Sequence, residues 1–323
     1  MNDQRVWPEA LSPLGERLTA AFGAKVSTTW AAALTAPRLP SFRVNLLKSP
    51  VEAVATACAV AGIRADPQPL APWAFTTDVE GERELKRHPL FHNGGIYVQS
   101  LPSQAGALAL DPQPGQRWLD ACAAPGGKTS LIATLSGKDT PGTAIEWSRV
   151  RFDQLRHTIH RQGCTWVQAV NQDSRSPSAA IRALRYGRIL VDAPCSGTGT
   201  LRLDDPRSYA HLADRYAGYA DIKAGQQRGI VSAMLTLLAP GGKLLYSTCA
   251  IDPVENELVV DALLKADPSL DLDLLTPPAG LPAVPALTRL GGLELDPRLA
   301  RCLRLAPSAL GEGFFLARLQ RRT

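Results

Sequence analysis

The sequence predicts an α/β fold built on an open, mostly parallel sheet with helices on both faces. From residue 117 onward, short apolar strands alternate with helical segments, and this alternation is typical of parallel sheets. Strands are expected at "RWLDA", "GTAIEW", "TWVQAVN", "RILVDAP", "KLLYSTC" and "GEGFFLARLQ". Ligands bind such sheets beyond the carboxyl ends of the strands, so the residues that follow each strand are the candidates for a site.

The first hundred residues have a different pattern. Leu14, Leu18 and Phe22 recur at helical spacing, and the strand-like runs "SFRVNLL", "GIRADPQPL" and "GGIYVQS" then accompany a helical "VEAVATACAVAG". The Pro- and Gly-rich stretch "DPQPGQ" follows. We therefore expect a helical segment with a small α+β domain at residues 1–110, and a catalytic domain at residues 111–323.

Composition narrows the functional class. The 323 residues include 35 Lys and Arg against 30 Asp and Glu, and the net charge of +5 is compatible with a nucleic-acid partner. No apolar run is long enough to cross a membrane, and the N-terminus lacks the apolar core of a secretory signal. The expectation is a cytoplasmic monomer without membrane contact. The six cysteines form no Cys-x-x-Cys pair and the histidines lack neighbouring ligands, so no metal site is predicted.

The turn "LDACAAPGGKTS" ends in Gly-Gly-Lys-Thr and so invites comparison with a phosphate-binding loop. The triphosphate motif requires a glycine at the position of Cys122, and Pro125 removes a backbone N–H from the loop. Glycines at 126 and 127 instead let a ligand approach the backbone. The turn is therefore expected to hold a nucleoside without a triphosphate, through Cys122, Ala123, Ala124, Pro125, Gly126, Gly127 and Lys128.

Two acids follow the next strands. Glu146 lies about 20 residues beyond the glycines, a spacing at which a carboxylate meets ribose hydroxyls. Asp173 is placed to accept a hydrogen bond from an adenine amino group. Either acid could instead cap a helix. Together with the glycine turn and Asp192, they predict a site for S-adenosyl-L-methionine, with Trp147 as a candidate to pack on the adenine.

Two cysteines follow the fourth and fifth strands of the catalytic domain. Cys195 lies in "VDAPCSGTG" and Cys249 in "LLYSTCAIDPVENE". Each lies past its apolar run, beside Pro, Ser, Thr or Gly, which favours a functional thiol over a packed core residue.

These motifs are specific enough to suggest a family. "DACAAPGGKT", "DAPCSGTG" and "YSTCAIDPVENE" resemble the signature motifs of the Nol/Nop/Sun (RsmB-like) RNA cytosine-C5 methyltransferases. "FRVN", "YVQSLPSQAG" and "GEGFFLARL" resemble its flanking motifs, so the similarity covers residues 40–320. The resemblance implies a class I S-adenosylmethionine-dependent methyltransferase fold, with a Rossmann-like, mostly parallel seven-stranded sheet and a small N-terminal RNA-binding domain.

The resemblance also implies roles for individual residues. Cys249 corresponds to the nucleophile that adds to cytosine C6, and Cys195 to the cysteine that assists product release. Asp192 is expected to contact the cytosine, with Lys128 near it. The alternative, that Cys195 is the nucleophile, stays open because the nucleophile of DNA cytosine methyltransferases also follows a proline.

The expected function is RNA 5-methylcytosine formation. Ribosomal RNA is the first expected substrate and tRNA the alternative. A non-catalytic RNA-binding assembly factor is the rival from another class, and the intact Cys195 and Cys249 argue against it. Arg202 and Arg207, in the stretch after "SGTG", are candidates for phosphate contact. Ser100 stands where an acid is usual in the family.

Overall fold

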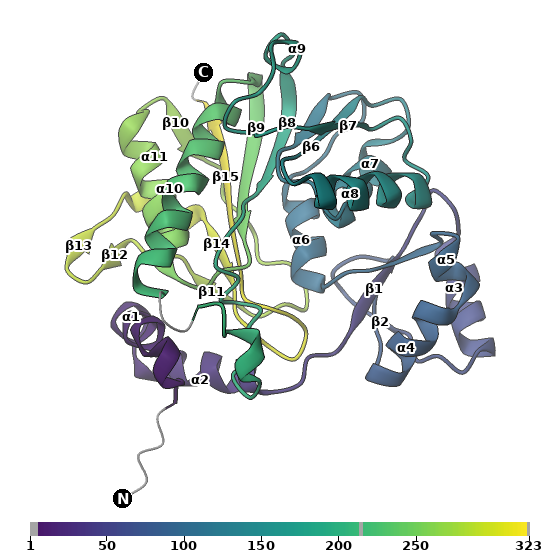
Figure 1. Ribbon diagram of the computed structural model, residues 1–323, viewed down its shortest axis with the longest axis horizontal. Helices are drawn as coiled ribbons and strands as arrows, with labels where there is room; N and C mark the ends of the chain where they lie inside the picture. The colour runs from purple at the N-terminus through teal and green to yellow at the C-terminus, as the bar shows by residue number, and fades with distance from the viewer. Residues whose placement is uncertain (1–5, 213–215, 322–323) are drawn as a thin grey trace, which may run out of the picture.

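The structure is a computed structural model that describes residues 6–212 and 216–321. In Figure 1 a large central sheet is covered by helices on both faces, and a smaller sheet lies to one side of it. The first described elements are a short 3-10 helix and two α-helices, which pack on the same side of the molecule as the large sheet. These are η1 (Glu9–Leu11), α1 (Ser12–Phe22) and α2 (Ala24–Thr35). Leu14, Leu18 and Trp30 are buried in the same core as the large sheet, so these helices are not part of the small sheet's core.

The small sheet has its own hydrophobic core. Its strands pair antiparallel in the order β2-β3-β1-β4, and Phe42, Phe75 and Ile96 are buried between the sheet and its helices. The strands are β1 (Ser41–Val44), β2 (Asp66–Pro67), β3 (Ala74–Thr76) and β4 (Ile96–Val98). The helices are α3 (Val51–Val60), α4 (Val79–Arg87) and α5 (Pro89–His92).

The large sheet contains nine strands within the described residues. Its main path runs β11-β14-β15-β9-β8-β5-β6-β7, and β10 also pairs with β15. The strands are β5 (Trp118–Asp120), β6 (Gly142–Glu146), β7 (Gln168–Asn171), β8 (Tyr186–Asp192), β9 (Leu238–Thr248), β10 (Leu270–Leu272), β11 (Ala283–Pro285), β14 (Leu303–Leu305) and β15 (Phe314–Arg321). A separate hairpin joins β12 (Arg289–Leu290) and β13 (Leu293–Glu294).

Helices cover both faces of this sheet. Along β8, Ile189 and Val191 face one apolar layer and Leu190 faces the other, as successive side chains of a strand must. The long helices are α6 (Leu101–Ala109), α7 (Gly127–Ser136), α8 (Arg149–Gln162), α10 (Tyr216–Leu235) and α11 (Glu257–Ala266). The short ones are α9 (Ala179–Arg182), η2 (Pro206–Ser208), η3 (Pro253–Glu255) and η4 (Pro297–Arg301).

The predicted fold class is confirmed. Strands β7, β6, β5, β8 and β9 pair parallel, and β15 enters antiparallel beside β9. With β10 these make the seven strands expected, in the order β7-β6-β5-β8-β9-β15-β10. Strands β14 and β11 extend the sheet beyond the expected seven: β14 pairs antiparallel with β15, and β11 pairs antiparallel with β14.

Two predicted strands begin earlier than expected. The strand predicted at "KLLYSTC" already begins at Leu238, shortly after α10 ends at Leu235. Pro240 lies within β9, where β9 meets β8 across an irregular register. Likewise the strand predicted at "RILVDAP" begins at Tyr186, and the preceding α9 is a single short turn.

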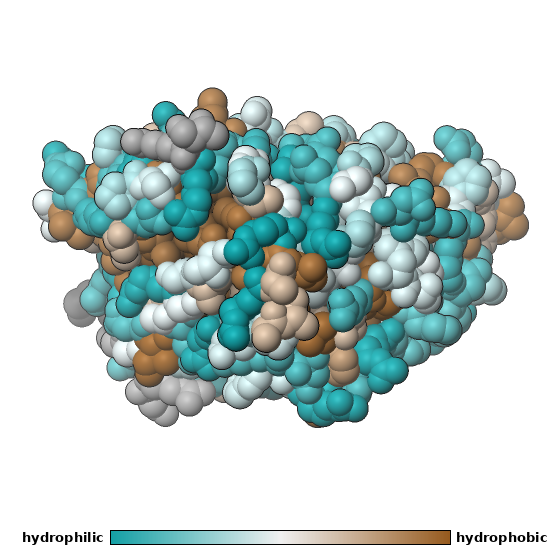
Figure 2. Space-filling view, turned by 90° about the horizontal axis from the view of Figure 1, so that it is seen from above, coloured by the Kyte–Doolittle hydropathy of each residue, from teal (hydrophilic) through white to brown (hydrophobic). Residues whose placement is uncertain are grey.

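No helix among the described residues is long and apolar enough to cross a membrane. Seen from above, the surface mixes hydrophilic side chains with bands of hydrophobic ones (Figure 2).

Candidate active site

Strand ends converge at one edge of the large sheet. Strand β5 is central, with β6 on one side and β8 on the other, and all three run parallel. The chain turns off these strands at Asp120, Glu146 and Asp192, which therefore share an edge. Two cavities lie there, and Cys122 lines both of them.

The first, which we call the Glu146 cavity, has a volume of about 360 Å³. Glu146, Trp147 and Asp173 line it, as the sequence predicts for a nucleoside site, and Trp147 is exposed. The wall opposite comes from Pro194 and from the α10 residues Lys223, Gln226 and Ile230.

The two acids of the Glu146 cavity already have partners. One Glu146 oxygen accepts from the Ser148 N–H at 2.8 Å, and the other lies 3.7 Å from Arg151. Asp173 receives a forked pair of bonds from the Arg175 guanidinium, which lowers the pKa of the Asp173 carboxyl. A ligand that donates a hydrogen bond to Asp173 therefore has to share the carboxylate with Arg175 or displace Arg175 from it.

The second, the Cys249 cavity, has a volume of about 290 Å³. Cys249 lines it, and the Cys195 sulfur lies 3.4 Å from the Cys249 sulfur. The hydrogen bond with Cys195, together with burial, raises the pKa of the Cys249 thiol well above its ordinary value. Cys249 is therefore a neutral thiol in this state of the site. Residues of the predicted turn also line the cavity: Cys122, Ala123, Ala124, Pro125, Gly127 and Lys128.

Lys128 and Asp192 form an ion pair in this cavity, with Nζ 2.8 Å from Oδ2. Ser247 donates to the other Asp192 oxygen at 2.8 Å. Burial alone would lower the pKa of Lys128, but the Asp192 carboxylate outweighs it, and the net shift is upward. The ammonium also lies 5.1 Å from the centre of the Phe314 ring. The structure thus brings together the lysine and aspartate that sequence reasoning paired.

The glycines of the turn make close packing possible. Gly126 has φ +107°, and a Cβ there would come within 2.9 Å of the Thr158 side chain. A Cβ at Gly127 would lie 3.0 Å from the Tyr97 ring. In this structure the glycines therefore admit α8 and the small sheet to the turn, and their contact with a ligand remains a prediction.

Asp120, the last residue of β5, is a further acid at this edge of the sheet. It lines the Cys249 cavity, is buried, and accepts from the Thr129 hydroxyl at 2.7 Å. Burial raises the pKa of Asp120 to about 7.

The "PVENE" motif supports both cysteine loops. Glu255 accepts from the N–H of Ser196, next to Cys195, and from the Gln227 side chain. Asn256 accepts from the Thr248 hydroxyl, next to Cys249, at 2.6 Å. The motif's second glutamate, Glu257, pairs with buried Arg304.

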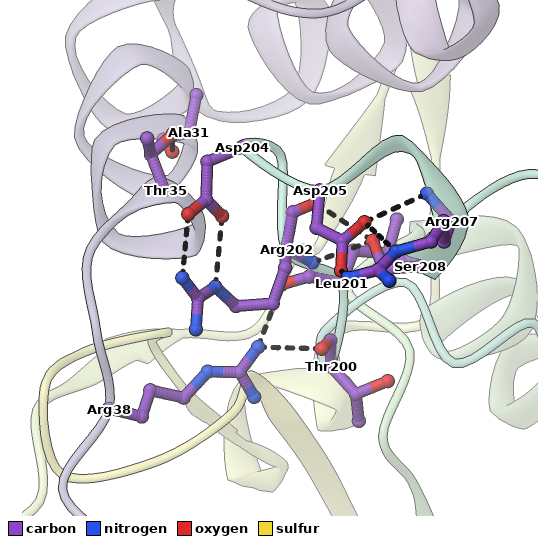
Figure 3. Close-up of polar contacts among 10 residues, drawn as sticks. All are labelled: Ala31, Thr35, Arg38, Thr200, Leu201, Arg202, Asp204, Asp205, Arg207 and Ser208. Carbon is purple, nitrogen blue, oxygen red and sulfur yellow. Dashed lines mark hydrogen bonds and ion pairs between the residues drawn. The ribbon is translucent and has the colours of Figure 1, made fainter.

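Arg38 is a residue that sequence reasoning missed. One of its guanidinium nitrogens donates to the backbone oxygens of Thr200 and Leu201, at 2.6 and 2.7 Å (Figure 3). Thr200 lines the Cys249 cavity, so an arginine from the N-terminal segment holds one of its walls. No pattern in the sequence links residues 162 positions apart.

The two predicted phosphate-contact arginines lie on the same loop. Arg202 forms a forked pair with Asp204, and Arg207 with Asp205 (Figure 3). Ser100, which replaces the acid usual in the family, donates to Glu312 at 2.5 Å, and Glu312 lines the Cys249 cavity. A carboxylate is therefore present near this position, supplied by the "GEGFF" motif.

The strand order, and the cavities at the central strand ends, define a class I methyltransferase fold. The family model described as "16S rRNA methyltransferase RsmB/F" matches residues 107–320, and the chain belongs to this family. The resemblance to the Nol/Nop/Sun (RsmB-like) methyltransferases is thereby confirmed.

Individual relatives agree with this family. The chain is 32% identical over 238 residues to the probable ribosomal RNA small subunit methyltransferase B of Bacillus subtilis, covering 74% of this chain and 52% of that protein. It is 34% identical over 300 residues to the ribosomal RNA small subunit methyltransferase F of Cronobacter sakazakii, covering 90% and 58%. The solved structure of a methyltransferase homolog protein from Pyrococcus horikoshii superposes with a TM-score of 0.80 at 29% identity, covering 100% of both chains. The chain thus spans just over half the length of these two curated relatives.

Proposed function

We propose that this protein is an RNA (cytosine-5-)-methyltransferase that transfers a methyl group from S-adenosyl-L-methionine to C5 of a cytosine in ribosomal RNA. One observation carries the proposal: the cavity lined by Glu146 and Asp173 and the cavity lined by Cys249 share Cys122 as a lining residue. The names of the relatives support ribosomal RNA as the substrate.

The residues of the Glu146 cavity fit S-adenosylmethionine. Glu146 is a buried carboxylate that can accept from ribose hydroxyls, Asp173 can accept from the adenine amino group, and Trp147 offers an aromatic face. The methionine end would lie toward the Cys122–Lys128 turn and Asp192, where the cavities meet. When bound, S-adenosylmethionine supplies the methyl group as an electrophile.

Cys249 is the proposed nucleophile because it lines the cavity that would receive the base. Cytosine C5 is a poor nucleophile on its own. When the Cys249 sulfur adds to C6, C5 gains enamine character and can attack the methyl group. Since Cys249 is a neutral thiol before the base arrives, its proton must leave as the sulfur–carbon bond forms.

Asp192 and Lys128 are proposed to bind the pyrimidine edge. The Asp192 carboxylate can accept from the cytosine amino group, and Ser247 and Lys128 hold that carboxylate in one orientation. The Lys128 ammonium adds positive charge where the base gains electrons during the addition.

Cys195 is proposed to assist release. After methylation the C5 proton must leave to a base, and the Cys249–C6 bond must then break. Cys195 is 3.4 Å from Cys249, close enough to act on the leaving sulfur or on the adduct beside it. The reverse assignment, with Cys195 as nucleophile, predicts that a covalent protein–RNA adduct persists in Cys249→Ala and maps to Cys195.

We further propose that RNA binding involves the small sheet within residues 1–110, and that residues 111–323 carry the chemistry. Arg43 of β1 supports this arrangement: its side chain donates to Ser130 of α7 at 2.8 Å, which joins the small sheet to the predicted turn. The ends of the two proposed units, residues 1–5 and 322–323, lie outside the described residues.

The test is methyl transfer in vitro. Radiolabelled S-adenosylmethionine is incubated with the protein and with transcribed small-subunit rRNA or total tRNA, and the RNA is then digested to nucleosides. Label in 5-methylcytidine from rRNA supports the proposal, whereas label only in tRNA selects the alternative substrate. Absence of label from both RNAs contradicts the proposal and favours a non-catalytic RNA-binding factor.

A further inference from the structure

A third cavity lies apart from the two described above and shares no lining residue with them. Its volume is about 380 Å³, and it is lined by Lys48, His92, Asn93, His157, His160 and Arg161. Two of these residues are permanent cations and three are histidines, and the lining contains no carboxylate. The fold brings His92 together with His157 and His160, which lie far from it in the sequence.

The cavity is built between the two sheets of the molecule. Lys48 follows β1 and His92 ends α5, both beside the small sheet, whereas His157, His160 and Arg161 belong to α8 on the large sheet. The segments touch closely at Gly94, where a Cβ would come within 2.0 Å of the Arg161 backbone oxygen. Asn45 donates to the backbone oxygens of Gly94 and Gln162 and so ties the two sides together.

At the C-terminal end of α8, donors from other segments bond the helix carbonyls that would otherwise repel an anion. The last carbonyls of a helix are partly negative and would repel one. Here the Lys48 ammonium donates to the Arg161 oxygen at 2.6 Å and to the Asn93 oxygen at 2.5 Å. Asn45 covers the Gln162 oxygen. An ammonium has three hydrogens, so one remains for a ligand after these two bonds.

Arg161 also has free binding capacity. Its guanidinium lies 4.7 Å from the centre of the Phe91 ring, which holds it in place. Its Nε is buried and has no hydrogen-bond partner among the described residues. A buried, unpaired N–H on a cation is costly unless a ligand accepts from it.

We infer that this cavity binds a phosphodiester group of the RNA backbone, at a second contact remote from the reacting base. The inference rests on the proposed function, which brings RNA to this protein. Cations and neutral donors without a competing carboxylate suit a phosphate, and a guanidinium with a free N–H suits its oxygens. A neighbouring cavity shares His160 and adds Arg156, so the basic surface continues along α8.

The test measures how salt affects RNA binding. Wild type, Arg161→Gln and His157→Glu are titrated with transcribed small-subunit rRNA at several salt concentrations. The control is Arg289→Gln, which removes an equal charge from an exposed position on β12, outside the small-sheet unit. Melting curves establish that each variant is folded. His157 is exposed, so its variant remains informative if Arg161→Gln is unstable.

Loss of one phosphate contact should weaken binding by about five- to eightfold at 0.1 M salt, because one contact contributes about 0.7–0.9 to the slope of log affinity against log salt. Arg161→Gln should lower that slope by about 1. His157→Glu should weaken binding at least as much, since it brings a negative charge to the site. Arg289→Gln should match wild type.

Two outcomes would overturn the inference. One is that Arg161→Gln and His157→Glu bind RNA with the affinity and salt slope of Arg289→Gln. The other is that inorganic phosphate or polyglutamate binds wild type more tightly than RNA does, and loses affinity in Arg161→Gln. Methyl transfer by wild type is measured in parallel. If methyl transfer is absent but the slope of log affinity against log salt still depends on Arg161, the proposed function is wrong and the phosphate site is supported.

Discussion

The sulfur atoms of Cys195 and Cys249 lie 3.4 Å apart, although 54 positions separate the two residues in the chain. Parallel strands β8 and β9 end side by side, and each cysteine follows its strand by no more than three residues. The hydrogen bond between the thiols is the largest of the causes that raise the pKa of Cys249.

Alkylation of Cys249 should therefore depend unusually on pH. Because its pKa is raised, the fraction of thiolate should still be increasing at pH 9, where an ordinary exposed thiol is mostly ionised. Cys195→Ala removes the hydrogen bond and should shift the alkylation profile to lower pH. Iodoacetamide labelling followed by peptide mass spectrometry measures this, with Cys249→Ala as the blank. A wild-type profile with the same midpoint as an ordinary exposed thiol would contradict the described hydrogen bond.

Arg38 should be needed to hold the loop that follows Cys195. Arg38→Ala removes two hydrogen bonds from a charged donor to the backbone of Thr200 and Leu201. Amide hydrogen exchange in residues 197–203 should become faster, and methyl transfer should fall by about tenfold, since a displaced wall misplaces the base. Arg64→Ala, at an exposed arginine paired with Asp66, is the matched control. Unchanged exchange in the loop would count against this role.

The difference between Arg38 and Cys249 shows what sequence reasoning can reach. The cysteines, Lys128 and Asp192 follow apolar strands, so topology alone predicts a shared edge. Arg38 donates hydrogen bonds to backbone oxygens. Every residue has such an oxygen, so no sequence motif identifies the acceptors. Strands β11 and β14 were not predicted, because each is three residues long and its pairing partner is distant in the sequence.

Glu255 should make the protein less stable as the pH rises toward neutrality. Burial raises the pKa of Glu255 from its ordinary 4.5 to about 7, so the folded state binds the proton more tightly than the unfolded state. Its contribution is fully present below pH 4.5 and is lost as the pH passes through 7, at up to about 1.4 kcal/mol per pH unit. Asp120, whose pKa is also raised to about 7, contributes in an overlapping window.

Glu255→Gln keeps the acceptor for Ser196 and cannot ionise. Its free energy of unfolding, measured by urea denaturation between pH 4.5 and 7.5, should vary less with pH than that of wild type. Glu80→Gln, at an exposed position on α4, should retain the wild-type dependence. An identical dependence in wild type and Glu255→Gln would show that this carboxyl is not perturbed.

Gly126 should be the most demanding glycine of the turn. Gly126→Ala imposes a positive φ on alanine and also forces the new Cβ against Thr158, for a combined cost of about 2–5 kcal/mol. Gly115→Ala has a positive φ but open space around it, and should cost about 1–2 kcal/mol. Thermal and urea unfolding of both variants separate the contact from the backbone strain. Equal losses of stability in the two variants would mean that the Thr158 side chain moves aside at no cost in free energy.

The assignment of Cys249 as nucleophile is tested most directly by mapping the covalent protein–RNA adduct. Wild type, Cys195→Ala and Cys249→Ala are incubated with S-adenosylmethionine and small-subunit rRNA, resolved on a denaturing gel, and any adduct is digested for peptide mass spectrometry. Cys195→Ala should accumulate an adduct in which a cytidine is attached to Cys249, and Cys249→Ala should form none. An adduct that persists in Cys249→Ala and maps to Cys195 would contradict the account.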